Sequence, residues 1–335
     1  MQDGQTCRRH GQLRLLVATA LLAVGPAARP ALADDGIDLT PPPESIADAG
    51  APAPTPDGEV ETSGIAGYFA GWADRVARAR ATQPSWASPL VTTTGLLEQR
   101  VRFDASQSQS GNGTDTTTLD GGKGLDMIVS DSNEIRIALP PYNIRSGAPA
   151  AIANGQPIEP LSGFGDWTFL RVEQRLASSP ESDGDYILSA WLQMLAPTGI
   201  ARLTTNTWAW SPVLAYGKGW GDFDIQGTFG TTVPAMHAGT LGHPVQNNVA
   251  LQYHIRPLFW PQIEANWTWF PDGQRGGLNQ VFLTPGVVLG RIPLGGSLGL
   301  SLGVGYQVAV SPAYRATPLT PLYDHAWLFS SRMSF

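Results

Sequence analysis

Charged side chains recur at every second position in several short segments of this sequence. Because successive side chains of a β-strand point to opposite faces, this spacing puts the charges of a segment on one face. Such a face can select solutes, or it can join neighbouring strands through ion pairs. Both roles remain open at this stage. The candidate residues are Glu98, Arg100, Arg102, Glu134, Arg136, Arg171, Glu173, Arg175, Asp224 and Glu264.

Few residues have the types and spacing of an enzyme active site. The four histidines beyond the N-terminal segment, at 237, 243, 254 and 325, form no close pair of metal ligands. There is no Gly-x-Ser-x-Gly turn and no phosphate-binding Gly-Lys-Ser/Thr loop. We therefore predict that the protein is not an enzyme, and we expect neither a metal site nor a cofactor.

The elements that position the charged residues are β-strands, because the pattern from Gly95 to the end of the chain has a period of two. Large apolar residues such as Leu302 and Val304 alternate with small or polar ones such as Gly303. We predict twelve strands, near 96–104, 122–130, 134–140, 166–177, 184–196, 206–217, 221–233, 246–256, 258–270, 279–290, 297–310 and 324–335. An even number of strands is what a single-chain bacterial membrane barrel requires.

The connections between these strands alternate in length. Those at 131–133, 178–183, 218–220, 256–257 and 291–294 are short, whereas most of those at 105–121, 141–165, 197–205, 234–245, 271–278 and 311–323 are longer. Outer-membrane barrels have short periplasmic turns and long external loops. The fold class that we predict is therefore all-β, an antiparallel up-and-down transmembrane barrel over residues 90–335 with both ends in the periplasm.

The first 33 residues have the three parts of a secretory signal peptide. Basic residues precede an apolar stretch over 15–24, and Ala31-Leu32-Ala33 follows, so we expect cleavage before Asp34. The only cysteine, Cys7, would be removed. Four of the 21 basic and one of the 28 acidic residues would go with it, leaving 17 and 27 and a net charge near −10. That charge argues against nucleic acid as a partner.

Two short regions separate the signal peptide from the barrel. Residues 34–62 are predicted to be a Pro-rich periplasmic linker. Residues 63–89 are predicted to form a short amphipathic helix, capped by Ser63, and its lead-in. The apolar residues of the helix are Ile65, Phe69, Trp72 and Val76. It could pack under the mouth of the barrel, plug the lumen or lie on the membrane surface.

Aromatic residues fall into three groups. Most tryptophans of the barrel lie near predicted strand ends, where amphipathic rings prefer the membrane interface. Trp167, Phe169 and Trp191 fall on the predicted lumen face and could stack on an aromatic solute. The last strand carries Trp327, Phe329, Met333 and Phe335 on one face, and this terminal aromatic pattern resembles the signal recognised by the bacterial barrel-assembly machinery.

Several short motifs resemble the outer-membrane β-barrel "transporter" family of the phenol-degradation meta-pathway type. They are Gly163-Phe164-Gly165-Asp166, Ala196-Pro197-Thr198-Gly199, the stretch 282–286 and the stretch 303–309. We interpret them as markers of strand ends and turns. The resemblance implies passage of aromatic or other hydrophobic solutes, and it brings no catalytic residues.

These observations predict a porin-like channel in the outer membrane of a Gram-negative bacterium, through which small solutes pass passively. Its expected partners are outer-membrane lipids, lipopolysaccharide, the barrel-assembly machinery and a small-molecule solute. A non-conducting structural or adhesive barrel is the main alternative. A lipid-modifying enzyme at the rim, using a serine with His243 or His325, is the third.

Overall fold

The computed structural model describes residues 64–110, 113–121, 123–146, 152–153, 156–157, 160–255, 258–311 and 323–335. The predicted signal peptide, the predicted linker and Ser63 lie outside these residues. Cleavage before Asp34 and the bounds of the linker therefore stay predictions.

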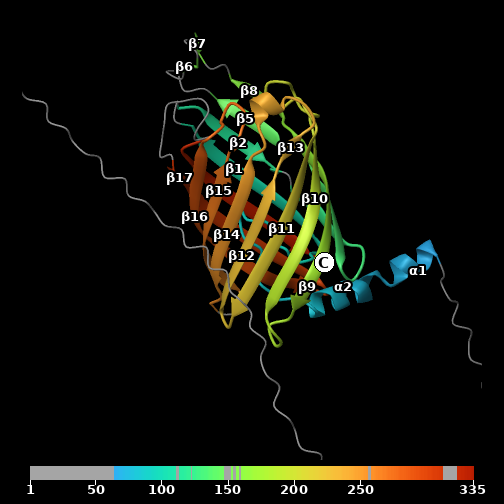
Figure 1. Ribbon diagram of the computed structural model, residues 1–335. Helices are drawn as coiled ribbons and strands as arrows, with labels where there is room; N and C mark the ends of the chain where they lie inside the picture. Colours follow the sequence, from blue (N-terminus) through green and yellow to red (C-terminus); the bar gives the residue numbers. More distant parts are fainter. Residues whose placement is uncertain are drawn as a thin grey trace, which may run out of the picture. The chain divides into compact units, whose positions relative to one another are not determined.

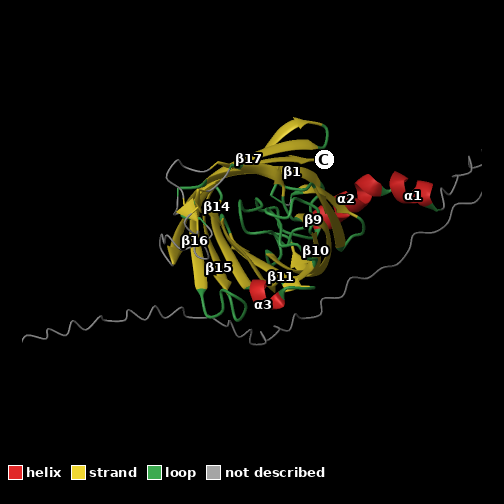
Figure 2. Cartoon of the chain, turned by 90° about the horizontal axis from the view of Figure 1, so that it is seen from above, coloured by secondary structure: helices red, strands yellow, loops and turns green. Residues whose placement is uncertain are grey.

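The chain forms a closed antiparallel barrel of twelve wall strands, shown from the side in Figure 1 and along its axis in Figure 2. Each wall strand pairs with the next, and β18 pairs with β1 along ten residues to close the ring. Three wall strands are interrupted once, so that β2 with β3, β4 with β5 and β8 with β9 each make one strand of the wall. The number of strands predicted from the sequence is confirmed.

The wall is built from β1 (Arg100–Gln109), β2 (Asp115–Leu119), β3 (Gly124–Ile128), β4 (Asn133–Ala138), β5 (Tyr142–Ser146), β8 (Leu161–Phe164), β9 (Trp167–Ser179), β10 (Tyr186–Ala196), β11 (Ala209–Trp220), β12 (Phe223–Thr231), β14 (Val245–Tyr253), β15 (Phe259–Trp269), β16 (Asn279–Gly295), β17 (Leu298–Ser311) and β18 (His325–Ser334). Two small additions are the hairpin of β6 (Ile152–Ala153) with β7 (Gln156–Pro157), and β13 (Val233–Pro234) beside β11.

The observed strands differ from the predicted ones in several places. β11 and β16 continue through the connections predicted at 218–220 and 291–294. β2, β5 and β8 lie in regions predicted to be loops, because stretches such as Asp115–Leu119 are mostly polar and lack the apolar alternation of a membrane strand. The first wall strand begins at Arg100, whereas the alternation predicted a strand over 96–104. Residues 96–99 are instead buried without being part of the wall.

The outer surface of the barrel is apolar and its interior is polar, the reverse of a soluble protein. On β17, for example, Leu302, Val304 and Val310 are exposed, whereas the alternating residue Gln307 is buried. Large apolar side chains are exposed in the same way on β9, β14, β15 and β18. Since a continuous exposed apolar belt is stable only against lipid, the chain is an outer-membrane β-barrel.

Two short helices precede the wall, α1 (Ile65–Ala70) and α2 (Trp72–Ala81), with the break between them at Gly71. The C-terminal half of α2 packs against the barrel through Val76 and Ala79, which join Ile128 in a buried cluster. Arg80 donates to the backbone oxygens of Gln99 and Phe335 at 3.2 Å each, so α2 is held at the end of the barrel where the chain terminates.

The remaining helix, α3 (Ala238–Leu241), is a single turn between β13 and β14. No helix in the described part of the chain is long and apolar enough to span a membrane.

The polarity of the wall predicts the effect of a charge on its outer face. We expect Val304→Arg, in the middle of β17, to lower the free energy of unfolding by about 2–4 kcal/mol, because the guanidinium would lie in the hydrocarbon region. Leu298→Arg, at the end of the same strand that lies beside the chain terminus, should cost only about 0–1 kcal/mol. Reversible urea unfolding in lipid vesicles measures both values, and equal costs would contradict this placement of the membrane.

Candidate functional site

The interior of the barrel contains a segment of the chain itself, visible as loop inside the ring of strands in Figure 2. We call residues 83–99 the luminal loop. Beyond the end of α2 the loop passes into the lumen and comes back, and its two ends are joined by Gln83. The Gln83 side chain donates to the Leu97 carbonyl at 2.9 Å and accepts from the Leu97 N–H at 3.0 Å. The luminal loop therefore enters and leaves through the same mouth.

The loop contains no helix or strand, so its backbone groups need partners from the wall. At its tip the carboxylate of Glu264 on β15 accepts hydrogen bonds from three consecutive N–H groups. The donors are Leu90 at 2.8 Å, Val91 at 3.0 Å and Thr92 at 2.5 Å. Glu264 is completely buried, and in the described part of the chain no ion pair involves it.

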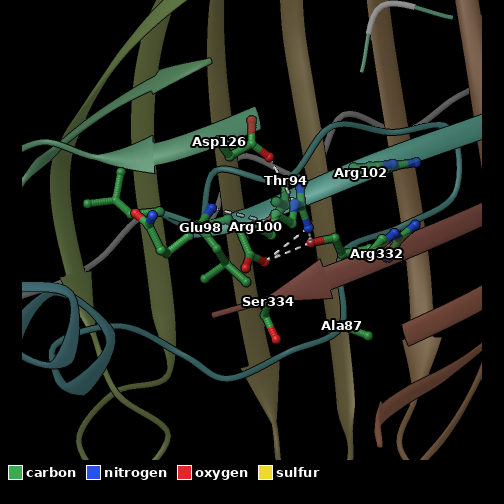
Figure 3. Close-up of polar contacts among 12 residues, drawn as sticks. Ala87, Thr94, Glu98, Arg100, Arg102, Asp126, Arg332 and Ser334 are labelled. Atoms are coloured by element: carbon green, nitrogen blue, oxygen red, sulfur yellow. Dashed lines mark hydrogen bonds and ion pairs between the residues drawn. The ribbon is translucent and has the colours of Figure 1, made fainter. Parts of the chain in front are cut away.

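Two guanidinium groups bind the carbonyls of the same tip. Arg102 on β1 donates to the Leu90 oxygen at 2.6 Å, and Arg332 on β18 donates to the Pro89 oxygen at 2.7 Å and also to the Ser88 oxygen. Arg102 and Arg332 are directly opposite each other in the strand register. Figure 3 shows them together at the lumen side of these two strands.

Arg102 and Arg332 differ in the groups that compensate their positive charges. Arg102 has an ion pair with Asp104 at 2.8 Å. Arg332 has no ion pair within the described residues, and its hydrogen-bond partners are loop carbonyls and the Ser330 hydroxyl. Like charges directly opposite on neighbouring strands are unfavourable, so the carbonyls of the loop compensate the second guanidinium.

The apolar side chains of the loop lie against glycines of the wall. A Cβ atom at Gly286 or Gly303 would be 2.5 Å from a methyl carbon of Leu90, and one at Gly305 would be 2.7 Å away. A Cβ at Gly217 would be 2.5 Å from the Trp86 ring. Real contacts of this kind are longer than 3.0 Å, so these glycines leave the space that the loop occupies.

This finding corrects our interpretation of two motifs. The stretches 282–286 and 303–309 lie inside β16 and β17, and their glycines face the luminal loop. The other two motifs do lie at strand ends, since Asp166 immediately precedes β9 and Pro197 follows β10. The sequence placed these glycines on the small-residue face of their strands. It could not show whether that face lines an open lumen or contacts another segment of the chain.

Most of the charged candidates form ion pairs, and these lie on one side of the barrel wall. Figure 3 labels Glu98, Arg100 and Asp126 of these ion pairs. Asp126 on β3 binds Arg100 at 2.8 Å and Arg136 at 2.9 Å. Arg171 binds Glu173 at 3.0 Å and also Glu134. Asp126, on which two guanidinium groups converge, was not among the residues that we singled out.

The other charged candidates lie in three places. Glu98 belongs to the luminal loop, where it accepts from the Ser88 hydroxyl at 2.9 Å and lies 3.3 Å from Arg100. Asp224 is buried on β12 and accepts from Gln226. Arg175 is half-buried at the mouth, where it donates to the Ala79 carbonyl at 2.8 Å. Ion pairing is thus observed for most of the set, and a role in solute selection stays a prediction.

The opposite side of the wall carries uncharged amides. A chain of hydrogen bonds runs from Gln226 to Gln252 at 2.9 Å, from Gln252 to Gln262 at 2.6 Å, and from Gln262 to Glu264 at 2.7 Å. Gln226 also donates to the Ala87 carbonyl of the loop at 2.9 Å. We did not single out these glutamines, although their alternate spacing along β12, β14 and β15 placed them on the lumen face.

The aromatic candidates have different environments. Trp191 is buried, and the Arg171 guanidinium lies 4.9 Å from the centre of its ring. Trp167 and Phe169 are half-buried, and the Trp167 indole donates to the Ala138 carbonyl at 2.7 Å. A stacking role with a solute stays a prediction for all three. Trp86, deep in the luminal loop, is an aromatic lumen residue that we missed because its segment has no strand pattern.

Two cavities border the luminal loop. One, of about 240 Å³, lies towards the mouth where α2 is held and is lined by Trp86, Trp260 and Arg291 among others. The other, of about 190 Å³, lies further towards the opposite mouth and is lined by Leu90, Val91 and Tyr323 among others. The loop therefore separates two spaces inside the barrel.

The histidines considered for a rim enzyme each bind a carboxylate. Nδ1 of His243 lies 2.7 Å from Asp272, and Nδ1 of His325 lies 2.9 Å from Asp324. The first contact joins two loops between strands, and its hydrogen bond lowers the pKa of the Asp272 carboxyl. No three metal-ligating side chains converge among the residues that the structure describes.

The residues of the proposed assembly signal lie on the outer face of the last strand. Trp327, Phe329 and Met333 are exposed on β18, and Phe335 is half-buried directly after it. Their outward orientation agrees with contact to lipid. Recognition by the assembly machinery stays a prediction.

Comparisons with known proteins give likenesses of the barrel alone. No protein-family model and no curated protein matches the sequence. Among solved structures, an outer membrane channel from Pseudomonas putida F1 is 14% identical, with 74% of this chain and 98% of that chain covered and a TM-score of 0.45. The NanC porin is 8% identical, with 70% and 98% covered and a TM-score of 0.41. The KdgM porin is 8% identical, with 70% and 99% covered and a TM-score of 0.36.

The ion pairs at Asp126 predict a large stability cost for removing its charge. We expect Asp126→Asn to lower the free energy of unfolding by about 3 kcal/mol or more, because it leaves two buried guanidinium groups under-compensated. Asp131→Asn is the matched control, since its ion pair with Arg78 is mostly exposed, and it should cost less than about 1 kcal/mol. Urea unfolding in vesicles compares the two, and similar values would show that the buried pairs contribute no more than an exposed one.

Proposed function

We propose that this protein is an outer-membrane channel for small solutes that the luminal loop holds closed and that opens when the loop is displaced. The observation that carries the proposal is the position of residues 83–99, which lie between the two cavities inside an already closed wall. The wall is complete without the loop, because β18 pairs directly with β1. Displacing the loop would leave the strand pairing intact.

The contacts of the loop suit a removable element. At the tip they are hydrogen bonds between wall side chains and loop backbone, from Glu264, Arg102 and Arg332. Water or a polar solute offers the same donors and acceptors, so these bonds can be exchanged at modest net cost. The loop's ties to the wall thus differ from strand pairing, which would have to be broken along a whole edge.

A non-conducting structural barrel is the competing function, and the filled lumen is the observation that favours it. The two functions differ in their response when the loop is forced aside. A channel then conducts, whereas a structural barrel loses stability without gaining a pathway. The aromatic or hydrophobic solute implied by the family resemblance remains an expectation, because the groups that hold the loop tip are charged or polar.

The glycines that contact Leu90 allow the loop to be displaced without touching its hydrogen bonds. We expect Gly303→Val to disfavour the closed state by about 1–3 kcal/mol through overpacking, which corresponds to about a five- to hundredfold shift towards the open state. Single-channel recording of the refolded protein in a planar bilayer should show more frequent openings than the wild type.

A second substitution tests whether the effect comes from the loop. Leu90→Ala removes the side chain that Gly303→Val would meet, so the double variant should return towards the closed state. Single and double variants must both show a folded barrel by gel mobility. If Gly303→Val folds but remains as silent as the wild type, the protein is not a channel closed by this loop.

A further inference from the structure

The wall contacts Leu90 of the luminal loop through its N–H group, its carbonyl group and its side chain. Its N–H donates to the Glu264 carboxylate at 2.8 Å, and its carbonyl accepts from the Arg102 guanidinium at 2.6 Å. Its side chain occupies the space left by Gly286, Gly303 and Gly305. We call the space beside these three glycines the glycine seat. The wall therefore places a carboxylate, a guanidinium and the glycine seat around one amino-acid residue.

The two charges beside Leu90 have no opposite charge of their own. Glu264 and Arg332 are 0% and 5% exposed, and neither forms an ion pair with any described residue. Besides Gln262 and Ser330, their partners are peptide groups of the loop. Buried charges that only neutral peptide groups compensate would bind fully charged partners more strongly.

We propose that, once the loop is displaced, this site binds a free α-amino acid with a branched aliphatic side chain, of which leucine is the type. This inference rests on the proposed function, because the loop must leave for a solute to bind. The ammonium group would take the place of the loop N–H groups at Glu264. The carboxylate would take the place of the Leu90 carbonyl at Arg102 and would lie beside Arg332, which is directly opposite Arg102 in the strand register. The side chain would fill the glycine seat.

The chemistry of the site distinguishes this class of ligand from its fragments. An amine without a carboxylate has no group to replace the loop carbonyl at Arg102, and an acid without an ammonium has no group to replace the loop N–H groups at Glu264. Glycine satisfies both charges but leaves the glycine seat empty. Only a ligand with all three parts replaces the contacts that Leu90 makes with the wall. The loop and the solute therefore compete for the same site.

Two variants of the full-length chain test the inference, and both are expected to displace the loop. Gly217→Leu would fill the space of the Trp86 ring, away from the Leu90 site, whereas Gly303→Val would fill the seat itself. Binding of radiolabelled L-leucine to the refolded proteins is measured by equilibrium dialysis. We expect leucine to bind Gly217→Leu about tenfold more tightly than the wild type, because loss of one strong loop contact weakens the competitor by that factor.

Competition and the second variant identify the contacts. Isopentylamine, isocaproate and glycine should each displace leucine from Gly217→Leu at least about tenfold less well than unlabelled leucine, because each lacks one of the three interactions. Gly303→Val should conduct yet bind no leucine. Both variants must show the folded gel mobility of the wild type.

The possible failures are separable. If both variants conduct but leucine binds them equally, or competes no better than its fragments, the amino-acid site is refuted and the channel stands. If both variants fold and neither conducts, the proposed function fails first and the inference with it. Tight leucine binding to Gly217→Leu that is abolished in Gly303→Val supports the site.

Discussion

The structure depends on one constraint, which is that an irregular chain segment inside a membrane barrel must find partners for its backbone groups. The luminal loop has no helix or strand to supply them. The wall therefore presents a carboxylate where the loop directs consecutive N–H groups, and guanidinium groups where it directs carbonyls. The glycines of β16 and β17 serve the same segment, since they leave space for the Leu90 side chain at its tip.

The distribution of charge around the wall has a physical reason as well. The strands of one side, β1, β3, β4 and β9, carry arginines and acids that pair with one another, while β12, β14 and β15 carry amides. Paired charges and chained amides supply one another with partners, although Arg100 and Gln226 also bind the loop, at Glu98 and at the Ala87 carbonyl. Glu264 and Arg332 depend on the loop most, because neither forms an ion pair with any described residue.

The sequence was sufficient to predict the barrel because the lipid imposes a period of two on every strand it contacts. It also placed Glu264 and Arg102 on the lumen face. It could not show that both bind the luminal loop. They bind backbone groups, which every residue has, so no residue type in the sequence indicates the contact. Leu96 and Leu97 were assigned to a strand because they are apolar, yet they are buried against the inner wall. We did not predict Arg332 as a lumen residue, because we considered only the outward-facing aromatic residues of the last strand.

The reciprocal pair of hydrogen bonds between Gln83 and Leu97 makes the luminal loop a hairpin with both ends at one mouth. The luminal loop is not threaded through the barrel, so it can be withdrawn or inserted with the ring of strands closed. Tension on the chain before α2 would reach the loop along the continuous backbone. Opening of the proposed channel would therefore require movement only of the chain inside the barrel, and no strand of the wall would have to move.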